Sequence, residues 1–234
     1  MKPILIFRHI ACEGPGYLGD YLTSRDIPFH TICLDQGEEV PHDPGASSGL
    51  VFMGGPMSVN DSLSCLDKEL KLIRTAYQEN IPVLGHCLGG QLISKALGGE
   101  ITSNPVPEMG WYPVTGYDNT LSIEWLRDLP EIFEVFHWHG ETFSLPDGAV
   151  PILQSAVCKN QAFVLGSSLA FQCHVEMKDS MVDEWFDIYE ADVPEPSSSV
   201  QSREQMLENL KGRIQNSKAV ADVFYEKWLS GLNL

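Results

Sequence analysis

Two hydrophobic patterns alternate along the first hundred residues. Short apolar runs predict buried strands, and segments whose apolar residues recur every three or four positions predict amphipathic helices. This alternation predicts an α/β fold whose central sheet is mostly parallel and flanked by helices on both faces. The predicted strands cover residues 3–7, 29–34, 50–53 and 82–84, and the predicted helices cover residues 17–25, 66–77 and 88–97.

The middle of the chain has a different pattern. Apolar runs follow one another closely there, so we expect some of these strands to pair antiparallel. They would either extend the central sheet or form a small additional antiparallel sheet. A further helix is predicted at residues 181–189. The predicted strands of this region cover residues 111–114, 132–138, 150–156, 161–165 and 169–174.

The C-terminal part differs in composition. Residues 193–199 read Val-Pro-Glu-Pro-Ser-Ser-Ser, which is typical of a flexible connector. Apolar residues then recur at helical spacing between residues 206 and 228. We expect one domain over residues 1–192, followed by a connector and a helical extension over residues 193–234 that packs on the same domain. A helix that docks a partner is the alternative.

Composition and charge narrow the range of partners. The chain has 234 residues, 43% of them hydrophobic, and a formal net charge of −17. This charge disfavours nucleic acids and anionic membranes as partners, because both are polyanions. The first apolar run is too short for a secretory signal, and no stretch approaches a membrane span. The six cysteines are scattered without a Cys-x-x-Cys pair, so we expect a reduced, cytoplasmic protein.

The strongest chemical signal is a cysteine between a strand and a helix. Gly85, Cys87 and Gly89 form a Gly-x-Cys-x-Gly stretch directly after the apolar run at 82–84. This is the nucleophile-elbow pattern, in which the flanking glycines relieve crowding in a sharp turn. The helix N-terminus would favour the thiolate of Cys87. The backbone N–H of Leu88 is then a natural donor to an oxyanion.

A thiolate nucleophile requires a base, and the base requires a residue that orients it. His174 and Glu176 lie two positions apart in a later apolar segment. In a strand such residues face the same way, so Glu176 can fix the tautomer of His174. We therefore predict a Cys87–His174–Glu176 triad.

A glycine-rich loop supplies the third element of the predicted site. Gly54 and Gly55 follow the apolar run at 50–53 and precede Pro56. Glycines let the backbone approach a ligand closely, so Gly54 would contact substrate and the N–H of Gly55 would be the second oxyanion donor. An ordinary turn is the alternative for such a tripeptide taken alone.

These stretches together resemble the signatures of the class I glutamine amidotransferases, in the order in which that family carries them. The resemblance spans roughly residues 45 to 190 and implies a flavodoxin-like fold with glutaminase chemistry. It also implies that Gln91 helps to hold glutamine. The matching stretches are Gly-Gly-Pro-Met-Ser-Val-Asn-Asp at 54–61, Gly-His-Cys-Leu-Gly-Gly-Gln at 85–91 and Phe-Gln-Cys-His-Val-Glu at 171–176.

Two further stretches extend the resemblance. The segment at 137–141 is similar to a His-Gly-Asp stretch near the glutamine pocket of the family, which implies substrate contacts by His139 and Gly140. The segment at 108–111, Glu-Met-Gly-Trp, resembles stand-alone, GMP-synthase-like members. The chain departs from the family at Val175, where proline is common, and at Glu141, which stands where aspartate is common.

The resemblance implies hydrolysis of the γ-glutamyl amide of glutamine through a cysteine thioester. No cofactor is expected. No metal is expected either, because the His-x-His pair at 137–139 has no third ligand at a telling spacing. Nothing after residue 190 resembles a synthetase domain, so any synthetase that consumes the ammonia would be a partner in trans. A free γ-glutamyl hydrolase acting on another γ-glutamyl compound, and a glutamine-sensing module without turnover, are the alternatives.

Overall fold

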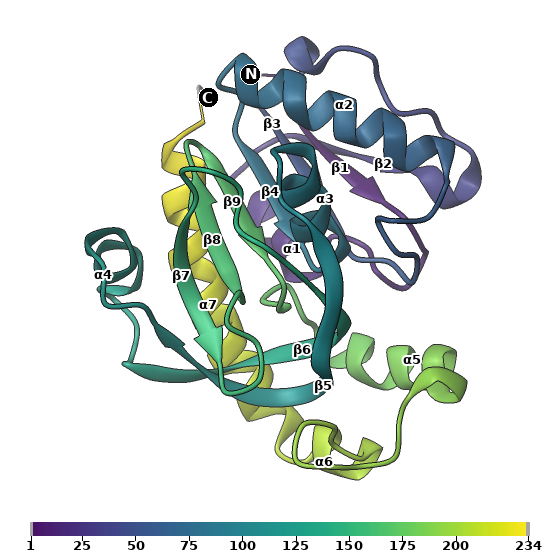
Figure 1. Cartoon of the computed structure of the whole chain (residues 1–234), viewed down its shortest axis with the longest axis vertical. Coiled ribbons are helices and arrows are strands. Elements are labelled where there is room, and N and C mark those ends of the chain that lie inside the picture. The colour runs from purple at the N-terminus through teal and green to yellow at the C-terminus, as the bar shows by residue number, and fades with distance from the viewer. Residues whose placement is uncertain (1, 233–234) are drawn as a thin grey trace.

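The computed structural model describes residues 2–232. Within this range nine strands form one sheet in the order β2-β1-β3-β4-β9-β8-β7-β5-β6 (Figure 1). The strands are β1 (Ile4–Arg8), β2 (Phe29–Cys33), β3 (Gly49–Phe52), β4 (Val83–His86), β5 (Ile101–Gly116), β6 (Ile132–Phe143), β7 (Val150–Ser155), β8 (Ala162–Leu165) and β9 (Ser168–Phe171).

The sheet is mixed. Four parallel pairings join β2, β1, β3, β4 and β9, and four antiparallel pairings join β9, β8, β7, β5 and β6. The α/β class is therefore confirmed, but two finer predictions are wrong: the sheet is mixed and not mostly parallel, and within residues 2–232 the antiparallel strands do not form an additional sheet. Strand β9 pairs with β4 on one edge and with β8 on the other, so the antiparallel strands continue the parallel half instead of separating from it.

Two strands of the antiparallel half, β5 and β6, are longer than the sequence predicts. Strands β5 and β6 pair over most of their length, with a register shift between Ser103 and Glu108. Pro105 and Pro107 lie in this irregular stretch, and proline is tolerated in strands at such bulges. These prolines and the polar residues around them conceal the first half of β5 from an analysis of hydrophobic pattern alone.

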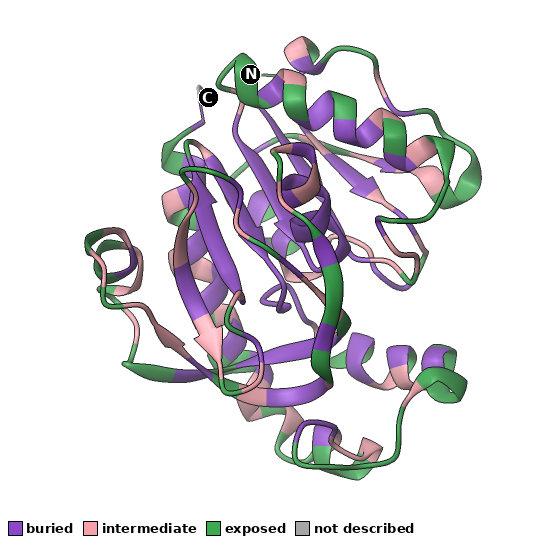
Figure 2. Cartoon of the chain, in the orientation of Figure 1, coloured by how far each residue is buried: buried purple, intermediate pink, exposed green. Residues whose placement is uncertain are grey.

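Helices cover both faces of the sheet. One apolar cluster packs α1 and α7 against one face, and a second packs α2 and α3 against the other. Strands β3, β4, β8 and β9, in the middle of the sheet, are wholly buried (Figure 2). The α-helices are α1 (Gly16–Ser24), α2 (Ser64–Gln78), α3 (Leu88–Ala96), α4 (Thr120–Leu126), α5 (Asp179–Tyr189), α6 (Arg203–Leu207) and α7 (Leu210–Ser230); short 3₁₀ helices span Leu34–Gln36, Pro44–Ala46 and Glu190–Asp192.

The C-terminal helix packs on the sheet of its own chain. Phe224, Tyr225 and Trp228 of α7 are buried in the same cluster as α1. The segment between α5 and α6 also packs against the sheet, because Val200 is buried and forms a β-bridge with Met109 of β5. The sequence did not predict α4, which begins after Asn119, whose side chain accepts a hydrogen bond from the Ser122 N–H.

Among residues 2–232, none of the helices combines the length and the apolar character needed to cross a membrane.

Candidate active site

Cys87 occupies a strained turn between β4 and α3. Its backbone has φ 49° and ψ −106°, a sparsely populated positive-φ conformation that costs a non-glycine residue about 1–3 kcal/mol. The turn is held by the Cys87 N–H, which donates to the Phe171 carbonyl at 2.9 Å, and by the Cys87 carbonyl, which accepts from the Gln91 N–H at 2.9 Å. A Cβ added at Gly89 would overlap the Phe52 carbonyl oxygen. The fold therefore fixes the sulfur at the carboxyl end of β4.

His174 and Glu176 form a buried pair. Nδ1 of His174 donates to Oε1 of Glu176 at 2.7 Å, and each side chain is 1% exposed. They do not lie on a strand as predicted, because β9 ends at Phe171. His174 instead forms an isolated antiparallel bridge with Phe136 of β6. The chain leaves β9 and crosses toward β6, and His174 and Glu176 lie on this crossing.

The charges of this pair follow from its surroundings. Burial alone would lower the pKa of His174, but ionised Glu176 and the interaction with Cys87 outweigh burial and hold that pKa well above its usual value. Burial alone would raise the pKa of Glu176, but His86 and His174 hold it below its usual range. The pair is therefore an imidazolium and a carboxylate at neutral pH.

His86 is a residue of this site to which the sequence analysis gave no role. Its Nδ1 lies 3.0 Å from Oε2 of Glu176, and both side chains are buried. Its ring stacks on Phe171 of β9 with centroids 5.5 Å apart. The elbow motif contains His86 at the variable position before the nucleophile, but only the pairing of β4 with β9 brings it beside Glu176.

The two candidate oxyanion donors lie close to the sulfur. Gly55, Cys87 and Leu88 line the same cavity. Leu88 is the first residue of α3, where backbone N–H groups have no acceptor within the helix. Gly54 lies against Glu13 and His174, since an added Cβ would overlap Oε2 of Glu13 and lie 3.4 Å from Cε1 of His174.

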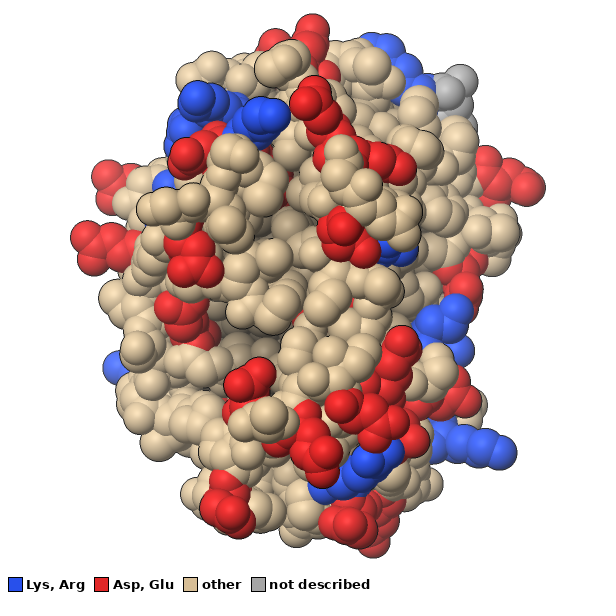
Figure 3. All heavy atoms as spheres, turned by 90° about the vertical axis from the view of Figure 1, so that its right-hand side faces the viewer, with Lys and Arg blue, Asp and Glu red and all other residues tan. Residues whose placement is uncertain are grey.

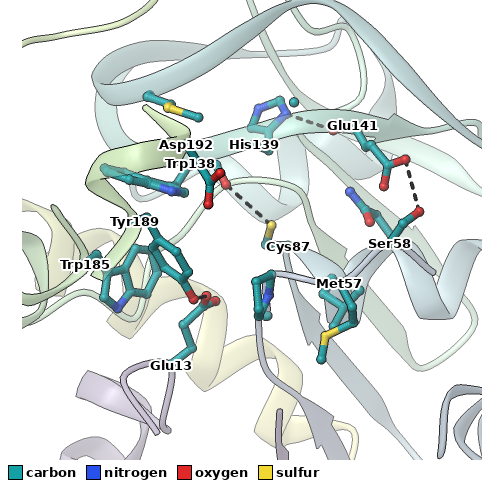
Figure 4. Close-up of a pocket in the computed structure, with 16 residues that line it drawn as sticks. Glu13, Met57, Ser58, Cys87, Trp138, His139, Glu141, Trp185, Tyr189 and Asp192 are labelled. Carbon is teal, nitrogen blue, oxygen red and sulfur yellow. Dashed lines mark hydrogen bonds between the residues drawn. The ribbon is translucent and has the colours of Figure 1, made fainter. Parts of the chain in front are cut away.

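The cavity has a volume of about 410 Å³ and two unlike sides (Figure 4). Trp138, Trp185 and Tyr189 form an aromatic wall on one side of Cys87, and Ser58 and Glu141 lie on the other. Besides Cys87 and His139, the ionisable residues that line the cavity are Tyr189, Glu13, Glu141 and Asp192. Within the described residues, no lysine or arginine lines the cavity. Acidic side chains also outnumber basic ones on the face of the molecule in Figure 3.

Of the four residues predicted to hold substrate, three line the cavity; Gly54 is not among its lining residues. Gln91, His139 and Gly140 line the cavity. The side chain of Gln91 donates to Oε1 of Gln172 at 3.2 Å, and Gln172 in turn donates to Sγ of Cys87 at 3.6 Å. Gln172 therefore connects the nucleophile to Gln91, a contact that spacing along the chain did not reveal.

Glu13 is a second residue that the sequence analysis missed. It follows β1, lines the cavity and accepts a hydrogen bond from the Tyr189 hydroxyl at 2.6 Å. Burial raises the pKa of its carboxyl, although the charge of His174 opposes the shift. A single acidic residue in a loop gave no signal, because the helix that carries Tyr189 lies far away in the sequence.

Glu108, His137 and His139 form a buried cluster whose donor atoms lie within 4.8 Å of one another. Glu108 is the third group that the spacing of the histidines did not reveal, so these residues could hold a metal. Its Oε2 already accepts from Gln161 at 2.6 Å and from Ser155 at 3.1 Å, and lies 3.2 Å from Nε2 of His139. Protein donors thus surround the oxygen that would bind an ion.

Comparison with known proteins places this geometry in a family. The model of the family "Glutamine amidotransferase class-I" matches residues 18–184. The glutamine amidotransferase-like protein YfeJ of Salmonella typhimurium is 32% identical over 181 residues, which cover 75% of this chain and 76% of that protein. A GMP synthase of Aeropyrum pernix is 29% identical over 227 residues, which cover 93% of this chain but only 40% of the synthase.

A solved structure is similar over the whole length. The crystal structure of a glutamine amidotransferase from Methylobacillus flagellatus has a TM-score of 0.95 and 41% sequence identity, and the match covers 100% of this chain and 96% of the other.

Proposed function

The chain belongs to the class I glutamine amidotransferase family, and from this membership we propose that it hydrolyses the γ-glutamyl amide of glutamine to glutamate and ammonia through a thioester on Cys87. The observation that carries the proposal is the position of Cys87. A cysteine held in a strained strand-to-helix turn, beside a buried imidazolium–carboxylate pair and in the wall of a cavity, is the arrangement that nucleophilic catalysis requires.

In the first half-reaction the thiolate of Cys87 attacks the γ-carbonyl carbon. The carbonyl oxygen becomes an oxyanion that accepts hydrogen bonds from the N–H groups of Gly55 and Leu88. His174, held protonated by Glu176, gives its Nε2 proton to the amide nitrogen. The C–N bond breaks, ammonia leaves, and a γ-glutamyl thioester remains on Cys87.

In the second half-reaction water attacks the thioester carbon. His174, now neutral, accepts a proton from this water, and the same two N–H groups hold the new oxyanion. The C–S bond then breaks, glutamate leaves, and the Cys87 thiolate and protonated His174 are restored. Glu176 remains ionised throughout and keeps Nδ1 of His174 protonated.

The aromatic side of the cavity favours a second candidate, hydrolysis of larger γ-glutamyl amides. A volume of about 410 Å³ lies within the range of pockets that enclose drug-sized ligands. A γ-glutamyl group on the side of Ser58 and Glu141 would place an organic leaving amine against Trp138 and Tyr189. Rates of the isolated chain with glutamine and with γ-glutamyl peptides that carry aromatic amines separate the two substrates.

The GMP synthase comparison suggests a partner in trans that consumes ammonia, because the chain matches 40% of that longer protein. Low glutaminase activity of the isolated chain that rises when a synthetase is added would support this partner. A glutamine sensor would instead bind glutamine stoichiometrically and form no thioester.

The proposal is tested with 6-diazo-5-oxo-norleucine, a glutamine analogue that alkylates catalytic cysteines with loss of N₂. Mass spectrometry of the full chain should find one adduct, on Cys87. The variant Cys87→Ala should lose both the adduct and ammonia release, whereas Cys65→Ala, which changes a partly exposed thiol of α2, should keep both. Ammonia release by Cys87→Ala at the wild-type rate, or adducts spread over several cysteines, would contradict the proposal.

A further inference from the structure

We infer that His9, held in place by Glu69, is a positioning residue that orients the peptide between Gly54 and Gly55 so that its N–H points at the reacting carbonyl. This inference rests on the proposed function, because Gly55 is there one of the two oxyanion donors. Neither His9 nor Glu69 belongs to the motifs by which the sequence resembles its family.

The contacts of His9 involve both ring nitrogens. Nδ1 lies 3.1 Å from the carbonyl oxygen of Gly54, and Nε2 lies 2.9 Å from Oε1 of Glu69 on α2. The two side chains are 1% and 0% exposed. The residue is thus fixed between the glycine loop and the helix that follows it.

The protons on this ring follow from its partners. A carbonyl oxygen only accepts hydrogen bonds, and so does a carboxylate, so both ring nitrogens of His9 must donate. The ring is therefore a buried imidazolium whose charge is balanced by Glu69. Burial alone would lower the pKa of His9, but the charge and hydrogen bond of Glu69 and the hydrogen bond to Gly54 raise it, in agreement with this assignment.

The Gly54 carbonyl and the Gly55 N–H belong to the same peptide unit. In a trans peptide these two groups point in opposite directions, so a hydrogen bond that holds the carbonyl toward His9 turns the N–H away from it. Gly55 lines the cavity with Cys87 and Leu88, and within residues 2–232 no protein acceptor takes its N–H. The N–H is therefore available to a substrate oxygen.

An anchor is needed here because two adjacent glycines can rotate with little steric resistance. The hydrogen bond from an imidazolium also polarises the amide, which strengthens its N–H as a donor. His9 thus has two effects through one contact: it sets the direction of the N–H, and it increases the positive charge that faces the developing oxyanion.

The test uses two substitutions, each of which keeps an N–H donor at the position of one of the two ring nitrogens. The amide nitrogen of His9→Asn replaces Nδ1 and can still donate to Gly54, whereas that of His9→Gln replaces Nε2 and reaches only residue 69. Both are made in the full chain with Glu69→Gln, so that no buried charge is left unpaired, and Glu69→Gln alone is the reference. Glutamine turnover and the rate of Cys87 alkylation by iodoacetamide are measured for each.

We expect kcat to fall about 10- to 100-fold with His9→Gln and less than threefold with His9→Asn, with little change in KM, because loss of an oxyanion donor costs about 10²–10³-fold and misdirection costs less. Iodoacetamide alkylation forms no oxyanion, so its rate should be the same in both variants. Equal kcat values for the two substitutions, or alkylation that slows in parallel with turnover, would overturn the inference. A wild-type chain without glutaminase activity would instead contradict the proposed function.

A measurement on the wild-type chain covers the case in which a variant does not fold. Nitrogen-15 NMR of the His9 ring at pH 7 should show both nitrogens protonated, with the Nδ1 proton in a hydrogen bond. An Nδ1 without a proton would overturn the inference, because Gly54 would then have no donor.

Discussion

Nδ1 of His86 lies 3.0 Å from Oε2 of Glu176, in a site where both side chains are buried. The other oxygen of the same carboxylate accepts from His174 at 2.7 Å. One carboxylate thus lies between two imidazoles, one of which directly precedes the nucleophile. This arrangement joins the elbow to the third member of the proposed triad, so the two cannot shift independently.

Replacing His86 by leucine should move the acidic limb of the pH–rate profile to higher pH. Burial would raise the pKa of Glu176, and His86 is the first of the groups that lower it. Without His86 the carboxylate takes up a proton at a higher pH, and a protonated Glu176 no longer keeps His174 charged. We expect the loss of kcat/KM relative to the wild type to grow as the pH falls. His86→Asn keeps a donor near Nδ1 but carries no charge, so it separates the contribution of the hydrogen bond from that of the charge. Identical acidic limbs in the wild type and His86→Leu would contradict this role.

The turn after the nucleophile should tolerate no side chain at Gly89. An alanine Cβ there would overlap the carbonyl oxygen of Phe52 and lie close to its carbonyl carbon. Since backbone atoms must move to admit it, we expect Gly89→Ala to lower the free energy of unfolding by about 3 kcal/mol or more. Gly140→Ala is the matched control, because nothing lies within 4 Å of the added Cβ and the φ angle of Gly140 is not positive. Urea unfolding measures both, and similar losses would contradict this account of the elbow.

His137 should make the protein less stable as the pH falls from about 6.5 to about 4. Burial lowers the pKa of His137 to about 4, although the charge of Glu108 opposes the shift. In this window the unfolded chain binds the proton and the folded chain does not, so the free energy of unfolding decreases with decreasing pH, by about 3 kcal/mol in total. His137→Asn removes the titration. Urea unfolding between pH 4 and pH 7 should give a shallower pH dependence for this variant, and equal slopes would refute the assignment.

Ionisation of Glu13 should make the free energy of unfolding depend on pH in the opposite direction. Burial raises the pKa of its carboxyl above the value in the unfolded chain. The folded chain therefore holds this proton more tightly, and stability decreases as the pH rises through the folded pKa. Glu13→Gln keeps the shape of the side chain and an acceptor for the Tyr189 hydroxyl without ionising. We expect this variant to be more stable than the wild type at pH 7 and equal to it near pH 4. A less stable variant at pH 7 would show that Glu13 is ionised and paired.

The sequence alone was sufficient for the features that depend on neighbours along the chain. Hydrophobic spacing predicted the strands of the parallel half and helices α1, α2, α3 and α5 to within a few residues, because each forms from a local pattern. The elbow around Cys87 could also be predicted from the sequence, because its two glycines, the nucleophile and the start of the helix lie within five residues. The first half of β5 and helix α4 were missed because prolines and polar residues obscure their patterns.

Tertiary structure decided what surrounds the nucleophile. The pairing of Leu84 with Leu169 places β4 beside β9, and this neighbourhood brings His86 to Glu176 and Gln172 to Cys87. In the same way, the packing of α2 on the sheet brings Glu69 to His9. Hydrogen bonds and ion pairs act over about 3 Å in space, whereas a sequence gives distance along the chain. Strand order and helix packing decide which distant residues become neighbours. The sequence therefore indicated the pair His174 and Glu176, which lie two positions apart, but not the contacts of His86, Glu13 and Gln172.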